Sequence, residues 1–522
     1  MSAPAKITYT STSGDLEEFH RLFDAALDVV KEQAGRSHPF YIGGVPVEDR
    51  PESLIDRSPT ATAFVLGRFV AATRGDVDAA VTNSRGAQPG WGRTPWRQRL
   101  AILRRAAAMI RDRKYELAAL MSLEVGKSRL ESMGDAEESA DLIDYYSQQV
   151  EDADGFVRSM ARITPIERNT DTLRPYGVFA CIAPFNFPLA LSAGMSSAAL
   201  AAGNAVVYKP AEDTPWTGVK LYEIYRDAGV PPGVFNLLNG RREEIGDPLW
   251  QHSGVDGVVF TGSRAVGMRI HAGLSRRWIK PCLLELGGKN AAVVLASADL
   301  DAAAEGVMRS AFSLQNQKCS ATSRVYVERG ALKPFLDRLL ERTRAIKIGD
   351  PSERDVFFGP VINDRSVRRF ERAVEQGRRE GTILLGGERL RGGVFESGHF
   401  VVPTIAQLPL GSSLFEEELF VPFLAVGEVA DLDQAIAETN RVEYGLTAGI
   451  FARSSSDVSR FFDEVEAGVC YANKRTGATT GAWPGAQPFC GWKGSGSTGK
   501  GGCGPYYVAQ FMREQSRTVI EG

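Results

Sequence analysis

The chain of 522 residues is poor in cysteine, histidine and net charge. Its six cysteines form no Cys-x-x-Cys pair, which is typical of free thiols in a reducing compartment. The formal net charge of −3 provides no basic surface for nucleic acid or for an acidic membrane. The five histidines lack the spacing of metal ligands, so we expect no metal and do not favour a metal hydrolase.

Long hydrophobic runs are also missing. The segment 176–208 has no charged residue, but Pro184, Gly194, Gly203 and other breakers interrupt it. A membrane-spanning helix needs about 20 predominantly apolar residues, so we expect buried strands and a helix here, and no membrane partner. The N-terminal residues lack the basic and then apolar order of a secretory signal. We therefore expect a cytoplasmic protein.

The patterns along the chain predict two α/β units. Apolar residues at three- and four-residue spacing predict helices over 15–32 and within 90–150. Short apolar strands alternate with helices over 177–285, as in "VFACIAP", "NAVVYKPA" and "VDGVVFTGS". A second series over 290–472 includes "NAAVVLAS", "SRVYVER", "ELFVPFLAVGEV" and "LTAGIFA". This alternation predicts parallel sheets covered on both faces, with a join near 285–289.

Two segments lie outside this alternation. Residues 157–175 alternate apolar and polar like an exposed strand pair, and residues 487–522 follow the second unit. Exposed strands pair readily with other chains. We therefore expect a homo-oligomer, a dimer or a larger assembly, held in part by these segments.

Two short motifs suit a dinucleotide. Lys209 ends a predicted strand, where open α/β sheets bind ligands, and it and Glu212 are suited to hydrogen-bond ribose hydroxyls. Gly262 and Ser263 lie between a strand and a helix, where free N–H groups accommodate a pyrophosphate. Taken separately, a strand-end lysine in water and a helix start without a ligand remain the alternatives.

A third region contains a candidate nucleophile and a candidate base. Cys319 lies in "LQNQKCSATSR", and Glu285 precedes a double-glycine turn in "LELGGKN". A buried inert thiol is the alternative for Cys319. Combined with a nicotinamide cofactor, however, a thiolate can attack an aldehyde, and a carboxylate-activated water can hydrolyse the resulting thioester. The side-chain amide of Asn186 is suited to stabilise the developing alkoxide.

These residues resemble the aldehyde dehydrogenase superfamily over almost the whole chain after about residue 40. The motifs that carry the resemblance are "PFNFP", "KPAED", "FTGS", "LELGGKN", "QKCSA", "EEELFVPF" and "QPFCGWKGSG". The resemblance implies an α/β fold with a Rossmann-type NAD-binding domain, an α/β catalytic domain and a β oligomerisation arm. The implied boundaries are 1–156 and 176–284 for the first, 285–472 for the second, and 157–175 with 487–522 for the arm.

The resemblance also implies the roles of individual residues. Cys319 would be the nucleophile, Glu285 the base and Asn186 an oxyanion-hole donor. Glu418 would hold the nicotinamide ribose, with Phe420 beside it. The residues expected to bind NAD are Ile182, Pro184, Lys209, Glu212, Gly262, Ser263, Gly267, Glu418 and Phe420.

Within the superfamily the chain is most similar to the 1-pyrroline-5-carboxylate (L-glutamate γ-semialdehyde) dehydrogenases. That similarity implies that Ser320, with the backbone of Gly477 and Ala478, binds the substrate's α-carboxylate. It implies that Phe187 and Phe489 sandwich the aliphatic stem. The expected reaction is the oxidation of this semialdehyde to L-glutamate in proline or arginine catabolism, with a separate proline dehydrogenase as a candidate partner.

Three departures and several alternatives stay open. Asn316, Val421 and Cys490 stand where the family usually has glycine, and Cys490 is expected near the substrate pocket. Another aldehyde, such as succinic semialdehyde, is the nearest alternative substrate, and NADP⁺ an alternative cofactor. A CoA-acylating enzyme is disfavoured by Glu285, since CoA needs no water-activating base. A catalytically silent binding protein on the same fold is disfavoured by the joint presence of nucleophile, base and amide.

Overall fold

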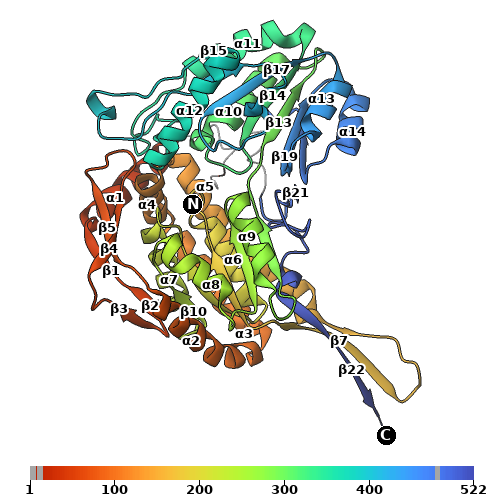
Figure 1. The fold of residues 1–522 in the computed structure, drawn as a ribbon. Coiled ribbons are helices and arrows are strands. Elements are labelled where there is room, and N and C mark those ends of the chain that lie inside the picture. Colours follow the sequence, from red (N-terminus) through yellow and green to blue (C-terminus); the bar gives the residue numbers. More distant parts are fainter. Residues whose placement is uncertain (1–7, 9–15, 476–482, 522) are drawn as a thin grey trace.

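The computed structural model describes residues 8, 16–475 and 483–521. Figure 1 shows two α/β units, one above the other, and a β arm that projects from the lower one. No described helix is both long enough and apolar enough to cross a bilayer. All six cysteines lie in the described part of the chain, and each is a free thiol.

The lower unit is built on a sheet with strand order β12-β11-β8-β9-β10-β2-β3. Strands β12 to β10 pair in parallel, whereas β2 and β3 add an antiparallel edge. The bounds are β2 Phe40–Ile42, β3 Val45–Val47, β8 Val178–Ile182, β9 Ala205–Lys209, β10 Phe235–Leu237, β11 Gly257–Thr261 and β12 Cys282–Glu285. Its crossover helices are α6 Ala190–Ala201, α7 Pro215–Asp227, α8 Asp247–Gln251 and α9 Arg264–Leu274.

Both faces of this sheet are buried. Along β8, Phe179 and Cys181 belong to one hydrophobic core, while Val178 and Ala180 belong to another on the opposite face. Alternate side chains of a strand point to opposite faces, so this division explains why the strand is a continuous apolar run. The prediction of a parallel sheet covered on both faces is confirmed.

The upper unit is built on a second sheet, with strand order β15-β16-β17-β14-β13-β19-β20. The bounds are β13 Asn290–Val294, β14 Thr322–Glu328, β15 Thr382–Leu385, β16 Thr404–Gln407, β17 Phe423–Val429, β19 Thr447–Phe451 and β20 Val469–Ala472. Its helices are α10 Leu300–Phe312, α11 Arg329–Arg344, α12 Asp364–Glu380, α13 Leu432–Asn440 and α14 Ser455–Glu464. Only the turn 286–289 separates β12 of the first sheet from β13 of the second.

The arm is a third sheet of order β22-β7-β6. It consists of β6 Val157–Ser159, β7 Glu167–Pro175 and β22 Met512–Ile520. β22 pairs antiparallel with β7 along its whole length, and most of its side chains are exposed. The predicted strand pair is therefore present.

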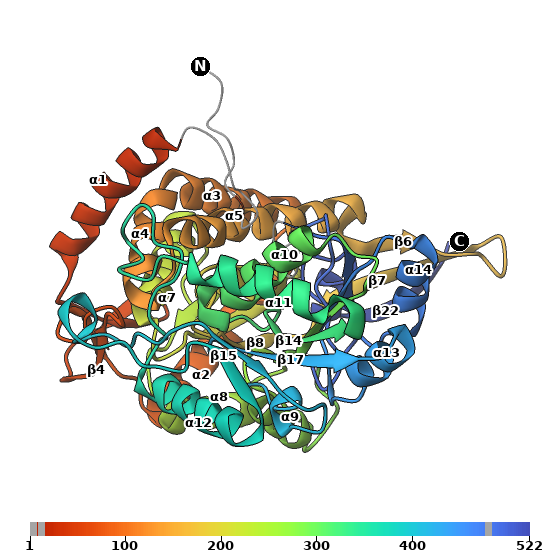
Figure 2. The same ribbon diagram turned by 90° about the horizontal axis from the view of Figure 1, so that it is seen from above.

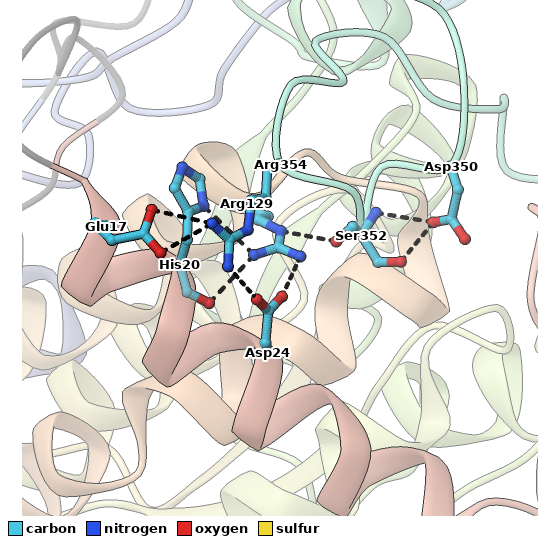
Figure 3. A network of polar contacts seen from close by, with 7 residues as sticks. All are labelled: Glu17, His20, Asp24, Arg129, Asp350, Ser352 and Arg354. Carbon is cyan, nitrogen blue, oxygen red and sulfur yellow. Dashed lines mark hydrogen bonds and ion pairs between the residues drawn. The ribbon is translucent and has the colours of Figure 1, made fainter.

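Further helices flank the lower unit. They are α1 Glu17–Gln33, α2 Arg74–Arg93, α3 Trp96–Asp112, α4 Lys114–Val125 and α5 Arg129–Asp152. Figure 2 shows α3 and α5 running side by side. Figure 3 shows how the N-terminal helix α1 is attached. Arg129 of α5 donates to Asp24 of α1 at 2.5 Å and to Ser352 O of the upper unit at 2.7 Å.

The main difference from the predicted elements lies near the N-terminus. From the sequence we assigned no element between the first helix and residue 90. In the structure β2 and β3 extend the first sheet, and another sheet has the order β1-β5-β4. These strands are β1 Arg36–His38, β4 Glu52–Arg57 and β5 Val65–Val70. In "ELFVPFLAVGEV" the strand starts only at Phe423, because residues 418–422 form a loop. A short pair, β18 Tyr444–Gly445 and β21 Trp492–Lys493, completes the strands.

Candidate active site

A cavity of about 850 Å³ lies at the carboxyl ends of the first sheet. Ile182, Lys209 and Thr261, the last residues of β8, β9 and β11, all line it. Open parallel sheets bind ligands at this edge. The opposite wall comes from the upper unit, through Arg365 of α12 and the loop that contains Glu418.

Most residues expected to bind NAD line this cavity. These are Ile182, Pro184, Lys209, Glu212, Gly262, Ser263, Glu418 and Phe420. Gly267 does not line it: this residue lies within α9, where an added Cβ would meet the Leu286 side chain at 2.4 Å. Gly267 therefore permits close packing of the helix against the turn that follows β12.

The cavity has the features that a dinucleotide needs. Ser263 is the N-cap of α9, so free backbone N–H groups and the positive helix end lie at the cavity wall. Gly287 approaches the Glu418 carboxylate so closely that a Cβ there would lie 2.0 Å from one oxygen. Lys209 is buried, and burial lowers the pKa of its amine to about 8. A phosphate-binding helix end and buried polar groups at the carboxyl edge fit the cofactor.

Arg365 pairs with Glu212 and offsets the negative charge of its carboxylate. Its guanidinium nitrogen lies 3.1 Å from the Glu212 carboxylate, which makes an ion pair across the two units. Both residues line the large cavity. The carboxylate that we expected to bind ribose hydroxyls is therefore paired with a cation.

Cys319 lies between a tight turn, Ser313–Asn316, and β14. The side chain of Asn290 holds this segment: its Nδ2 donates to Cys319 O at 2.6 Å and to Ala321 O at 2.9 Å. Asn290 Oδ1 in turn accepts from Thr447 N at 3.0 Å. One buried amide thus ties the segment around Cys319 to β13 and β19.

The backbone that leads to Cys319 is unusual. Leu314, Gln315 and Asn316 have positive φ angles of 48°, 55° and 59°. Residues other than glycine rarely adopt this conformation, and it is often found near active sites. Asn316 stands where the family usually has glycine, and asparagine tolerates this region better than most residues. The side-chain nitrogen Nδ2 of Asn316 donates to Ala311 O and Thr322 O, and these two bonds hold the residue in this backbone conformation.

Cys319 and Glu285, the candidate nucleophile and the candidate base, are each half-buried. Burial raises the pKa of the Cys319 thiol to about 12, and the negative charges of Glu418 and Glu285 act in the same direction. Burial also raises the pKa of Glu285 well above its ordinary value, against one backbone hydrogen bond from Gly502. Lys318 is paired with Glu131, with Nζ 2.8 Å from a carboxylate oxygen.

A second cavity, of about 100 Å³, meets the first at Cys319, which lines both. Glu285, Phe187, Ser320 and Phe489 line this smaller cavity, so the structure brings them together around the thiol. Gly477 and Ala478 lie outside the described residues.

Asn186 lines the larger cavity. Its Nδ2 donates to Gln317 O at 2.8 Å, which fixes the amide beside the segment that leads to Cys319. An amide nitrogen carries two protons, so this bond leaves a second donor for an oxyanion. The role of oxyanion donor stays a prediction.

The small cavity also contains residues that we did not predict from the sequence. Glu138 and Cys503 line it, together with Tyr146 and Tyr507. Cys490, which we expected near the substrate pocket, does not line it, and its Sγ lies 3.6 Å from Gly468 O. Glu138 sits among other acidic residues on α5, so no spacing singles it out, whereas Cys503 lies in a glycine-rich segment without a recognisable pattern.

Comparisons with known proteins agree with this geometry. The aldehyde dehydrogenase family profile matches residues 47–516. A 1-pyrroline-5-carboxylate dehydrogenase of Geobacillus sp. (strain WCH70) is 36% identical over 516 residues, 98% of each chain. A solved 1-pyrroline-5-carboxylate dehydrogenase from Thermus with bound NAD has a TM-score of 0.93 and 36% identity, with both chains covered fully. Proline utilization A from Bdellovibrio bacteriovorus has a TM-score of 0.92 and 31% identity, over 54% of its own length. The chain therefore belongs to the aldehyde dehydrogenase family.

Proposed function

We propose that the chain oxidises L-glutamate γ-semialdehyde, the open form of 1-pyrroline-5-carboxylate, to L-glutamate with NAD⁺. The observation that carries this proposal is the position of Cys319, which lines both a dinucleotide-sized cavity and a small adjoining one. Two relatives named for 1-pyrroline-5-carboxylate, one of them solved with NAD, support the choice of substrate and cofactor.

The cofactor would occupy the larger cavity. Lys209 and Glu212 would hold the adenosine ribose, and Ser263 with the N-terminus of α9 the pyrophosphate. Glu418 would accept hydrogen bonds from the nicotinamide ribose. The chemistry that NAD⁺ supplies when bound is the acceptance of a hydride.

The chain's own residues would perform the remaining steps. Only a thiolate attacks, so the Cys319 thiol first gives up its proton to water. Burial, which raises the pKa of this thiol to about 12, makes that loss costly. The Cys319 sulfur then adds to the aldehyde carbon, while the Asn186 amide stabilises the oxyanion. After the hydride leaves, the acyl group is a thioester on Cys319. Glu285 accepts a proton from the water that hydrolyses this thioester, and the product carboxylate departs.

The smaller cavity fits an amino acid with an aliphatic stem. Phe187 and Phe489 supply apolar walls, and Ser320 offers a hydroxyl to the α-carboxylate. Glu138 also lines this cavity, and its negative charge would attract the α-ammonium group. Succinic semialdehyde has no such group, so Glu138 favours the glutamate semialdehyde over that alternative.

The decisive experiment is NADH formation by the purified protein with pyrroline-carboxylate, with succinic semialdehyde and propanal as competing substrates. We expect a clear preference for pyrroline-carboxylate and no NADH from Cys319→Ser. Glu138→Gln should erode the preference over succinic semialdehyde. A preference for another aldehyde that still requires Cys319 would refute the substrate and keep the mechanism, whereas NADH from Cys319→Ser would refute both.

The cellular setting belongs to the same proposal. A separate proline dehydrogenase would supply the pyrroline-carboxylate, and the match to a protein named proline utilization A supports this link. The free thiols of all six cysteines suit the cytoplasm. We assign cofactor binding to the lower unit (residues 1–156 and 176–284), catalysis to residues 285–472, and assembly into an oligomer to the arm.

A further inference from the structure

Lys289 is a buried cation in the turn 286–289, which follows Glu285, and the mechanism above does not use it. It ends the turn that joins the two sheets, directly after Gly288. Its relative exposure is 1%, and its Nζ has no hydrogen-bond partner among the residues that the structure describes. Buried lysines without a partner are costly, so this one calls for an explanation.

The backbone of this turn contacts the carboxylate expected to hold the nicotinamide ribose. Gly288 N donates to Glu418 Oε1 at 2.9 Å, one residue before Lys289. The charges that act on Lys289 are those of Arg324, Glu418 and Glu417. Arg324 is itself anchored, because its Nε donates to Lys289 O at 2.7 Å.

Electrostatics link the two groups in both directions. Burial lowers the pKa of Lys289 to about 7, Arg324 acts in the same direction, and Glu418 and Glu417 oppose the shift. Burial raises the pKa of Glu418 to about 7, and the Gly288 N–H, Lys289 and Arg369 oppose that shift. The ammonium of Lys289 thus favours the charged form of Glu418 near neutral pH.

We propose that Lys289 is a positioning residue for the cofactor: its buried ammonium keeps the Glu418 carboxylate ionised, in the form that accepts hydrogen bonds from the nicotinamide ribose. This inference rests on the proposed use of NAD⁺ and names a determinant of how tightly the cofactor binds. Hydrogen bonds to an ionised carboxylate are about twice as strong as those to a neutral group.

The inference has a defined sign. Without the ammonium, Glu418 loses a stabilising charge, so its pKa rises and the carboxyl group is protonated over more of the neutral range. Affinity for NAD⁺ should then fall near neutral pH and recover at high pH, where Glu418 is ionised in either protein. A purely structural role for Lys289 would weaken binding equally at every pH.

The test is the dissociation constant for NAD⁺, measured by calorimetry between pH 6 and 9 on the full-length protein. For Lys289→Met we expect an affinity for NAD⁺ about fivefold weaker than that of the wild type near pH 7 and within twofold of it at pH 9. The pH below which affinity falls should be higher in this variant than in the wild type. Methionine has a similar length and no charge, so its burial costs less than that of an unpaired ammonium. Lys289→Gln is a second neutral variant, and Lys289→Arg, which keeps the cation, should retain the wild-type pH profile.

Glu418→Gln provides the control, because it removes the group that titrates. In that background Lys289→Met should have no further pH-dependent effect. Three results would each overturn the inference. They are a loss of NAD⁺ affinity that is equal at every pH, a pH profile of affinity that is unchanged in both neutral variants, and a pH-dependent effect of Lys289→Met that persists with Glu418→Gln. If the wild-type protein binds no NAD⁺ at any pH, the proposed cofactor fails and the inference fails with it. Normal wild-type binding with any of the three results overturns the inference alone.

Discussion

At the scale of single residues, Arg365 changes what Glu212 can do at the cofactor cavity. A free carboxylate beside the adenosine ribose would repel a 2′-phosphate. Here the Arg365 guanidinium lies 3.1 Å from that carboxylate, and both side chains line the cavity. A guanidinium also binds phosphate in a bidentate manner. The pair should therefore admit NADP⁺ as a second, weaker cofactor.

Arg365→Ala should make the enzyme more selective for NAD⁺. Removal of the guanidinium leaves Glu212 unneutralised, so kcat/KM with NADP⁺ should fall about fivefold more than kcat/KM with NAD⁺. Arg368→Ala is the matched control, since Arg368 lies on the same helix and pairs with Asp364 outside the cavity. Equal losses with both cofactors would show that Arg365 does not act on the 2′ position.

The residues of the site differ in how readily the sequence reveals them. Glu285 precedes a double-glycine turn, and Cys319 stands in the family motif "QKCSA", so pattern and chemistry coincide there. Arg365 and Glu138 approach the cavities from distant parts of the chain, and no local spacing marks either one. The motif "LELGGKN" contains Lys289 but does not reveal that this residue is buried without a hydrogen-bond partner, because both properties depend on packing.

At the scale of elements, a buried pair of acidic residues joins β4 to the start of α7. Glu124 of α4 accepts from Trp216 N at 2.8 Å and Thr217 N at 3.2 Å. Asp56 of β4 is buried beside it. Burial and the charge of Glu124, with a smaller effect of Asp213, raise the pKa of Asp56 well above its ordinary value. Burial raises the pKa of Glu124 to about 7. The folded pair therefore holds a proton that the unfolded chain releases above about pH 4.

The stability that this pair contributes should consequently fall as pH rises from about 4 through 7. Over this range the folded pair binds more protons than the same two residues do in the unfolded chain, so its contribution to the free energy of unfolding decreases with pH. Asp56→Asn keeps a hydrogen-bond donor for Glu124, and the amide that replaces the carboxyl group does not titrate. The variant should be about 1–3 kcal/mol more stable than wild type at pH 8, with a smaller difference at pH 5, by urea unfolding.

Asp337→Asn on α11, where the carboxylate is exposed, should show no such pH dependence. A constant stability difference between Asp56→Asn and wild type at both pH values would contradict the shared proton.

Elements could be predicted where burial follows a simple period. The parallel strands are buried on both faces and the helices have one apolar face, so both patterns appear directly in the sequence. The strands β1 and β4 are short, polar and partly exposed. Their partners in β5 lie 31 residues away for β1 and 8 to 18 residues away for β4. Periodicity carries little information about such strands.

At the scale of the whole molecule, the arm exposes apolar side chains that a monomer would leave in water. The exposed residues are Val157, Met160, Ile163, Ile166, Val519 and Ile520. They lie on β6, on β22 and in the connection between β6 and β7, which project from the body of the molecule (Figure 1). Contiguous exposed apolar surface is typical of protein interfaces, and sheet edges pair readily with other strands.

The arm should therefore hold an oligomer together, and charge placed on it should weaken that oligomer. By light scattering after gel filtration, the wild-type protein should have at least twice its chain mass of 56.7 kDa. The double variant Val519→Lys with Ile520→Lys should dissociate at protein concentrations about tenfold or more above those needed for the wild type, because burying lysines costs free energy. Val394→Lys is the control, since this exposed residue lies in the upper unit, away from the arm. A wild-type mass of one chain would refute the assembly, and an unaffected double variant would place the interface elsewhere on the molecule.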